Sequence, residues 1–244
     1  MGVTGIKLLA FDVFGTVVDW RTSIAREAVP FLAAVGRPEL DPHAFADGWR
    51  GLYQPAMAEV REGRRPFERL DVLNRETLEV LLGRYGIDPA GVGEARLAEF
   101  AQAWRRLDPW PDAVAGLTRL KRDYTIVTLS NGNIALMTAL ARFGGLPWDA
   151  ILGAEVTGHY KPDDQSYLGT AEIMGLAPAE VCLVAAHHSD LAAARRNGLA
   201  TAYVARPLEY GGRPAPDLAQ RQDWDWSVGS LLELADALAI TPVP

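Results

Sequence analysis

The chain has 244 residues, 49% of them hydrophobic, which is enough apolar material for a sizeable core and excludes disorder of the whole chain. Its 24 basic and 31 acidic residues leave a net charge of −7. This charge opposes the phosphate attraction of non-specific nucleic-acid binding, so no nucleic-acid partner is expected. No uncharged apolar stretch reaches the ~18 residues of a membrane span, and the start lacks a leader pattern. We therefore expect a cytoplasmic protein with no membrane partner.

Short apolar runs predict the strands of a parallel sheet, because each run is too short and too uniformly apolar for a half-exposed helix. These runs cover residues 6–12, 124–130, 181–186 and 201–205. Helical patterns follow them at residues 112–122, 134–143, 165–174, 190–197 and 228–238. Alternating strands and helices predict an α/β fold with a doubly wound, Rossmann-like parallel sheet.

The segment 20–107 contains no convincing strand. It shows helical patterns at residues 24–34, 44–62, 67–85 and 94–106, separated by glycine and proline breaks. We therefore predict an all-helical domain over 20–107, inserted after the first strand into a core formed by 1–19 and 108–244. Such an insert should cap the carboxyl ends of the strands, where open α/β sheets bind ligands. A Pro/Gly-rich stretch at 206–216 is predicted to be a surface loop.

Polar residues follow successive predicted strands. Asp12 ends the first, Ser130 and Asn131 end the second, and Asp190 follows the run at 181–186, while Lys161 is one of only three lysines. Each has a simple structural alternative: Asp12 and Ser130 as helix N-caps, Lys161 as a solvated charge, and Asp190 as a carboxylate near a helix N-terminus. Because the carboxyl ends of parallel strands share one edge of a sheet, these residues are expected to converge on one crevice.

In this order the residues resemble the four motifs of the haloacid dehalogenase superfamily, and the helical insert looks like its cap domain. The resemblance implies that Asp12 is a nucleophile and that Ser130, Lys161 and Asp190 are catalytic. Most members of that superfamily are magnesium-dependent phosphatases.

Two departures argue against phosphatase chemistry. Phe14 stands where the phosphatases have a second, proton-donating aspartate, and a phenyl ring cannot donate a proton. Ala186 stands where they have an aspartate that helps to hold magnesium, a cation that prefers six oxygen ligands. We therefore expect no metal and no cofactor, and a leaving group that needs neither a proton nor a metal. Halide is such a group.

Residues 12–16, 130–132 and 161–163 resemble the L-2-haloacid dehalogenase branch specifically. The resemblance implies hydrolysis of short 2-haloalkanoic acids to 2-hydroxy acids, with inversion, through an ester on Asp12. The implied partners are a small anionic haloalkanoate and a halide ion. Related enzymes are often homodimers, so a homodimer is also an expectation.

The resemblance also implies site roles. Two carboxylates ~5 Å apart repel by roughly 3 kcal/mol at an effective dielectric of 20, so Lys161 is assigned to stabilise Asp12, with Thr16 and Ser130 hydrogen-bonding around it. Amides at helix N-termini are expected to hold the substrate carboxylate. The substrate and halide set comprises Arg50, Asn131, Phe14, Phe67 and Tyr167. An ordinary surface arginine is the alternative for Arg50, and core packing is the alternative for Tyr167.

His187 and His188 depart from the branch. His187 aligns with an asparagine of the family, and its imidazole, oriented by Asp190, is interpreted as a catalytic group. Its two candidate roles are to activate the hydrolytic water or to donate a hydrogen bond to substrate or halide, and the alternative is that it only occupies a loop. His188 is expected only to occupy a loop.

Two other functions stay open: a magnesium-dependent phosphatase of the same superfamily, and a non-catalytic homologue that binds an anionic metabolite. Halide release in chelator would favour dehalogenation. Aryl phosphate hydrolysis that requires magnesium would favour the phosphatase, and no turnover of any haloacid would favour the non-catalytic homologue.

Overall fold

The computed structural model describes residues 5–239, and its main sheet has six parallel strands in the order β5-β4-β1-β6-β7-β8. The strands are β1 (Leu8–Phe11), β4 (Thr125–Ser130), β5 (Ala150–Gly153), β6 (Val181–Ala185), β7 (Ala200–Val204) and β8 (Trp226–Val228). The predicted Rossmann-like α/β fold is confirmed. Two strands of this sheet, β5 and β8, were not predicted, and both lie at its edges. The apolar run of β5 is short and only half buried, and Ser227 interrupts the partly exposed β8.

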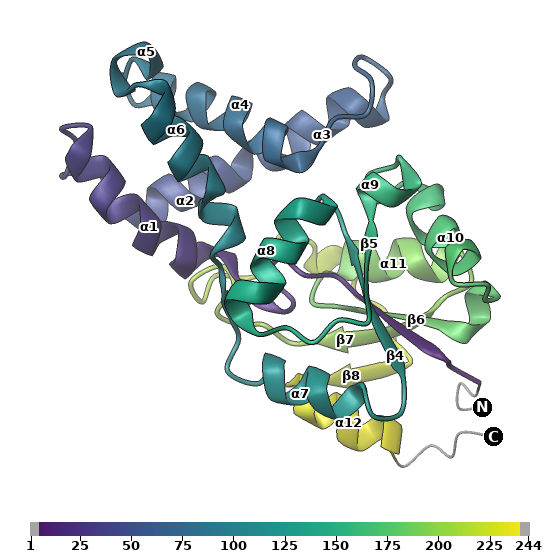
Figure 1. Ribbon diagram of the computed structural model, residues 1–244. Helices are drawn as coiled ribbons and strands as arrows, with labels where there is room; N and C mark the ends of the chain where they lie inside the picture. Colours follow the sequence, from purple (N-terminus) through teal and green to yellow (C-terminus); the bar gives the residue numbers. More distant parts are fainter. Residues whose placement is uncertain (1–4, 240–244) are drawn as a thin grey trace.

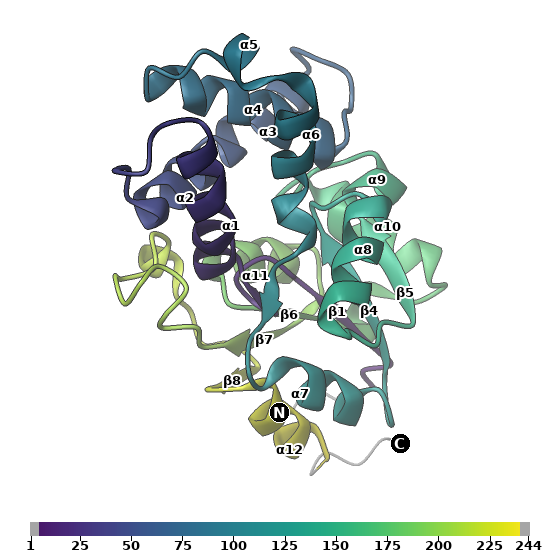
Figure 2. The same ribbon diagram turned by 60° about the vertical axis from the view of Figure 1, so that its left-hand side comes forward.

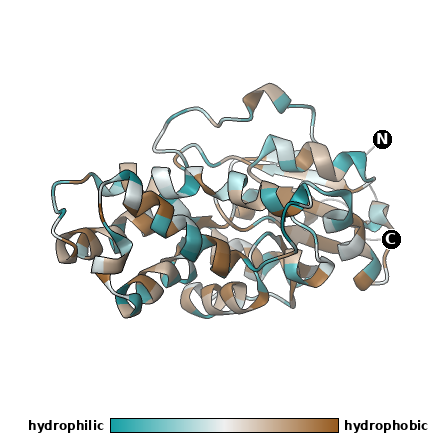
Figure 3. Ribbon diagram, turned by 90° about the horizontal axis from the view of Figure 1, so that it is seen from above, coloured by the Kyte–Doolittle hydropathy of each residue, from teal (hydrophilic) through white to brown (hydrophobic). Residues whose placement is uncertain are grey.

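Helices cover both faces of the sheet (Figures 1 and 3). Leu9 and Phe11 of β1 pack on one face with α7 (Ala113–Leu120), α8 (Ile134–Gly144) and α12 (Leu231–Ala239). Leu8 and Ala10 pack on the other face with α10 (Asp164–Ile173) and α11 (His188–Arg196). Side chains alternate along a strand, so a β1 strand that is apolar at every position requires cover on both sides. Shorter helices are α9 (Ala154–Thr157) and the 3₁₀ helices η2 (Pro178–Glu180) and η3 (Leu218–Gln220).

After β1 a two-strand ribbon, β2 (Val18–Asp19) with β3 (Asp108–Pro109), forms the base of the insert, and all elements between β2 and β3 are helices. The helices are α1 (Trp20–Ala34), α2 (Pro42–Gly51), α3 (Tyr53–Arg61), α4 (Leu70–Arg84), α5 (Pro89–Val92), α6 (Glu94–Ala101) and the 3₁₀ helix η1 (Gln102–Arg105). We refer to α1–η1 as the helical segment. The single helix predicted over 44–62 is two helices, since Pro55, without an N–H, fits only the first turn of a new helix. None of the helices in residues 5–239 has the length and apolarity needed to cross a membrane.

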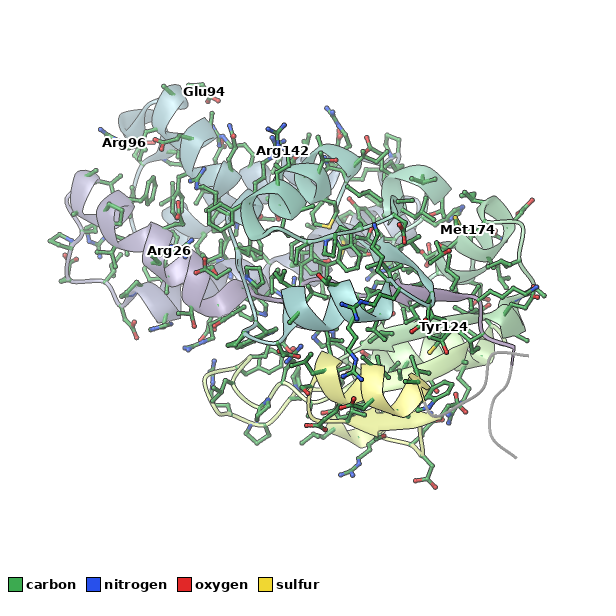
Figure 4. The ribbon with its side chains drawn as sticks, turned by 60° about the horizontal axis from the view of Figure 1, so that its bottom comes forward. Arg26, Glu94, Arg96, Tyr124, Arg142 and Met174 are labelled. Atoms are coloured by element: carbon green, nitrogen blue, oxygen red, sulfur yellow. The ribbon has the colours of Figure 1, made fainter. Side chains whose placement is uncertain are left out.

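The helical segment has an aromatic interior and a charged exterior. Phe31 and Phe100 stack with their ring centroids 4.0 Å apart, and Trp49 stacks on Phe100 at 5.2 Å. Glu94 and Arg96 lie at its outer surface (Figure 4). Packing of these buried aromatic residues fixes the position of α2 and therefore of Arg50, which follows Trp49.

Hydrogen bonds hold the helical segment beside the carboxyl ends of the strands (Figure 2). Asp71 N donates to Asn133 Oδ1 at 3.1 Å, and Asn133 Nδ2 donates back to Asp71 Oδ2 at 2.9 Å. Tyr160 Oη donates to the Glu68 carbonyl at 2.6 Å. The space between the helical segment and the sheet edge is therefore defined by contacts from both sides.

Candidate active site

A cavity of about 670 Å³ lies where the helical segment meets the carboxyl ends of the strands. Asp12 follows β1 and His187 follows β6, while Arg50 is the penultimate residue of α2. The lining side chains belong to Asp12, Phe14, Arg50, Tyr53, Gln54, Arg61, Asn131, Lys161, Pro162, Tyr167, His187, Ser189, Asp190, Arg196, Tyr210, Pro216, Asp217 and Gln220. The cavity thus joins residues that are distant in the sequence.

Lys161 lies between two buried carboxylates. Its Nζ donates to Asp12 Oδ1 at 2.9 Å and to Asp190 Oδ2 at 2.5 Å. Tyr167 Oη donates to Asp190 Oδ1 at 2.6 Å, and the Lys161 backbone N–H donates to Asn131 Oδ1 at 2.8 Å. Lys161 therefore lies beside Asp12, as the motif order predicts.

Asp12 is held as an anion. Burial alone would raise its pKa, but the Lys161 ammonium and hydrogen bonds from His187 and Thr16 outweigh burial and keep the pKa well below its usual range. Burial likewise opposes the charge of Lys161, yet the two neighbouring carboxylates raise its pKa. The pKa of Asp190 is raised, first by burial and then by the charge of Asp12. Asp12 is therefore the carboxylate best prepared to act as a nucleophile.

The second oxygen of Asp12 accepts two further hydrogen bonds. Thr16 Oγ1 donates to Asp12 Oδ2 at 2.6 Å and accepts from the Ala186 backbone N–H at 2.8 Å. His187 Nδ1 lies 3.0 Å from the same oxygen. Thr16 therefore links the turn after β1 to the end of β6.

Glu209 is a site residue that the sequence analysis missed. Its side chain is 2% exposed, and its Oε1 lies 3.0 Å from His187 Nε2 and accepts from Trp20 Nε1, also at 3.0 Å. The expectation that Asp190 orients His187 is wrong, because Asp190 binds Lys161 and Tyr167 instead. Glu209 lies within the predicted surface loop, where no spacing or apolar pattern marked a buried carboxylate.

Both ring nitrogens of His187 therefore face carboxylates. Burial lowers the pKa of the imidazole, but the charges of Glu209 and Asp12 and their hydrogen bonds raise it well above its usual value. A doubly protonated ring donates to both neighbours, so His187 is an imidazolium when Asp12 is ionised.

His188 has a different environment. It begins α11, stacks on Tyr203 with ring centroids 4.6 Å apart and accepts from Trp224 Nε1 at 3.1 Å. The expectation that it merely occupies a loop is wrong, because its ring is buried. Burial lowers its pKa, so the neutral ring that accepts from Trp224 is favoured.

Arg50 occupies an aromatic cage. Its guanidinium carbon lies 4.1 Å from the Tyr53 ring centroid, 5.4 Å from that of Trp20 and 5.9 Å from that of Phe14. Its Nη1 is buried and has no hydrogen-bond partner among residues 5–239. Arg50 is therefore not an ordinary surface arginine, and it can donate to an anion in the cavity.

Two other expectations differ from the structure. Ser130 Oγ accepts from Gly132 N at 3.1 Å instead of binding Asp12. Phe67 is not part of the cavity wall, because its ring packs on Tyr160 at 5.3 Å.

Two amides at helix N-termini also differ from the expectation. Ile134 N, at the start of α8, donates to Glu155 Oε2 at 2.7 Å, and Ser189 N, near the start of α11, donates to Asp217 Oδ2 at 2.8 Å. These two amides are thus occupied by carboxylates of the chain itself, and they are not free to hold a substrate carboxylate.

The residues present do not fit the magnesium site of the phosphatases. The Lys161 ammonium occupies the position between Asp12 and Asp190 that a cation would need, and the side chains of Phe14 and Ala186 offer no oxygen. Across the described part of the chain, no group of three or more His, Cys, Asp or Glu side chains is arranged to hold a metal ion.

The chain belongs to the haloacid dehalogenase-like hydrolases, since the model of that family matches residues 6–198. A solved structure of a defluorinating L-2-haloacid dehalogenase is 47% identical, with a TM-score of 0.92 over 96% of this chain and 95% of that chain. The (S)-2-haloacid dehalogenase of Xanthobacter autotrophicus is 31% identical over 212 residues, which are 82% of this chain and 76% of that protein. A solved structure of the L-2-haloacid dehalogenase from Xanthobacter autotrophicus with chloropropionic acid covalently bound is 26% identical, with a TM-score of 0.79 over 96% of this chain and 98% of that chain. The predicted resemblance to the L-2-haloacid dehalogenase branch is confirmed.

Proposed function

We propose that this hydrolase acts on carbon–halide bonds, converting short 2-haloalkanoic acids to 2-hydroxy acids with inversion and without a metal ion. The observation that carries the proposal is the buried Asp12 carboxylate, kept ionised by Lys161 in a cavity that also contains the caged Arg50 guanidinium. The names of the similar proteins support the substrate class, and the covalently bound chloropropionic acid in one of them supports a covalent intermediate.

In the first half-reaction an Asp12 oxygen attacks the substrate α-carbon from the side opposite the halogen. The new C–O bond forms as the carbon–halogen bond breaks, and the halide leaves with the bonding electron pair. Arg50, Asn131 and Phe14 line the cavity and are assigned to the departing halide. Together with Arg50, two further lining arginines, Arg61 and Arg196, attract the anionic substrate.

In the second half-reaction water attacks the ester carbonyl carbon of Asp12. Esterification removes the negative charge of Asp12, so the His187 imidazolium loses one of its two anionic neighbours and releases its proton to solvent. The neutral ring then accepts the proton of the attacking water. Each turnover releases one hydroxy acid, one halide and one proton.

The helical segment acts in this proposal as the cap domain, spanning 20–107, over a core formed by 1–19 and 108–244. Arg50 and Tyr53 support this division, since they reach the cavity from the helical segment, whereas Asp12, Lys161 and His187 reach it from the sheet. The cap therefore supplies anion binding and excludes water, and the core supplies the nucleophile.

The test is a single turnover of L-2-chloropropionate with excess enzyme in oxygen-18 water and chelator, followed by mass analysis of the peptide that contains Asp12. We expect one oxygen-18 atom in Asp12 and none in the first lactate released. Label that enters lactate directly, or turnover that requires added magnesium, would overturn the proposal. Asp12→Asn is the control and should release no halide.

A further inference from the structure

We propose that Glu209 is a positioning residue that holds His187 for hydrolysis of the aspartyl ester, a role that rests on the proposed dehalogenation. The residue comes from the turn after β7, whereas His187 follows β6, so two neighbouring strands of the sheet place the pair side by side. Hydrolysis of the ester would then depend on a carboxylate that contacts His187 and not Asp12 itself.

The turn that carries Glu209 is anchored to the rest of the site. Glu209 N donates to the Arg206 carbonyl at 3.1 Å. The Arg206 guanidinium pairs with Asp112 at 2.7 Å and donates through Nε to the Thr16 carbonyl at 2.8 Å. Because Thr16 also binds Asp12, the same residue helps to position both the Glu209 turn and Asp12.

The Glu209 carboxylate packs directly against Gly15, where only a glycine leaves room for it. A Cβ atom at Gly15 would lie 2.1 Å from Glu209 Oε1, far inside van der Waals contact. Gly15 also has a φ of +87°, a backbone conformation that residues with a Cβ rarely adopt. The turn after β1 thus serves the nucleophile and leaves room for the carboxylate behind His187.

The hydrogen bonds determine which nitrogen can act. Nδ1 faces Asp12 Oδ2 at 3.0 Å, and Nε2 faces Glu209 Oε1 at 3.0 Å and Oε2 at 3.2 Å. In the neutral ring Glu209 keeps the proton on Nε2, which leaves Nδ1 as the base, and it then stabilises the imidazolium that forms. Trp20 Nε1 donates to Oε1 and fixes the carboxylate in this orientation.

The hydrolytic step balances with this assignment. The water oxygen bonds to Asp12 Cγ as one water proton moves to His187 Nδ1, and the Cγ–O bond to the substrate then breaks. The proton on Nδ1 passes to the departing alcohol oxygen. The other water proton passes from the new Asp12 carboxyl to His187 Nδ1 as Asp12 ionises, which restores the imidazolium, and Glu209 remains an anion throughout.

The experiment separates the two half-reactions of Glu209→Gln with excess enzyme and L-2-chloropropionate. We expect the chloride burst within about threefold of the unsubstituted rate and ester decay slowed by about 10²–10³-fold, as for loss of general base catalysis. Peptide mass analysis would then show the ester accumulating on Asp12. Histidine NMR of the free enzyme should show a lower pKa for His187, an effect that a purely structural role would not produce.

Glu209→Asp tests the charge separately, since it keeps the carboxylate but shortens the side chain by one methylene. Its ester decay should fall between those of Glu209→Gln and the unsubstituted chain. Glu180→Gln is the matched control and should change neither step. Glu180 directly precedes β6, so it lies at the amino ends of the strands, away from the site at their carboxyl ends.

Equal slowing of burst and decay in either Glu209 variant, or unchanged decay in both, would overturn the positioning role. If Glu209→Gln does not fold, Glu209→Asp still gives this comparison. Absence of a chloride burst from the unsubstituted chain would instead overturn the dehalogenation on which the inference rests.

Discussion

At the scale of single residues, the site alternates anions and cations. Lys161 lies between Asp12 and Asp190, and His187 lies between Asp12 and Glu209. Asp12 therefore has a cation at each of its oxygens. This arrangement explains how three buried carboxylates coexist, since each would be costly to bury without a partner.

Lys161→Met tests the first cation. The variant should lose at least about 10²-fold in the chloride burst, because Asp12 loses its main electrostatic support. It should also unfold more easily, by about 3–5 kcal/mol, since two buried carboxylates lose their shared partner. Stopped-flow halide detection and urea unfolding measure the two effects. Lys7→Met, at an exposed ion pair, is the control, and a burst that matches it would contradict the assignment.

The pH dependence of stability tests the second cation. The pKa of His187 is raised in the folded chain, so its stabilising contribution is complete below about 6.5, the unfolded value, and is lost as pH rises through the folded pKa. We expect His187→Asn to lower the free energy of unfolding more at pH 6 than at pH 10. Urea titrations at both pH values measure the difference, and an equal or larger loss at pH 10 would argue against a buried imidazolium.

At the scale of elements, the site depends on three turns. The turns after β1, β6 and β7 carry Asp12, His187 and Glu209, and parallel strands bring those turns to the same edge. Hydrogen bonds from Thr16 and Arg206 then join the turns to one another. A change in one turn should therefore affect the chemistry of a residue in another.

Gly15→Ala tests this dependence. Its Cβ would displace the Glu209 carboxylate, so ester decay should slow more than the chloride burst, and strain at positive φ should reduce stability by about 1–3 kcal/mol. Gly36→Ala is a matched control, because Gly36 has a φ of +77° but nothing within 4 Å of the added Cβ. Slowing of ester decay in the control, or none in Gly15→Ala, would contradict the steric explanation.

At the scale of the whole molecule, the cavity exists only where the helical segment meets the sheet. The reciprocal hydrogen bonds of Asp71 and Asn133 and the bond from Tyr160 to Glu68 hold the two parts together. Substrate binding should therefore respond to contacts that lie outside the cavity wall.

Asn133→Ala removes both hydrogen bonds to Asp71. We expect a loss of about 1–3 kcal/mol in unfolding free energy. We also expect a severalfold rise in KM, because the helical segment would be docked, with Arg50 at the cavity, in a smaller fraction of the molecules. Asn197→Ala provides the comparison, since Asn197 joins α10 to α11 within the core. An Asn133→Ala KM equal to that of Asn197→Ala would show that docking of the helical segment does not control binding.

Much of the fold was predictable from local pattern. The central strands β1, β4 and β6 are buried on both faces, so their apolar runs identify them without any tertiary information. The edge strands β5 and β8 give a weaker signal, because both are short and only partly buried. Asp12, Lys161 and Asp190 were predictable because ordered motifs at strand ends must meet at one edge of a parallel sheet.

The sequence by itself determined the α/β class, the helical insert and the meeting of Asp12 with Lys161, since these depend on periodicity and on motif order. Only the tertiary structure decided that Glu209, rather than Asp190, lies behind His187, that Ser130 binds Gly132, and that Phe67 packs away from the cavity. The physical reason is that the partners of a side chain depend on the direction in which a turn places it, and a turn has no repeating pattern that records this direction.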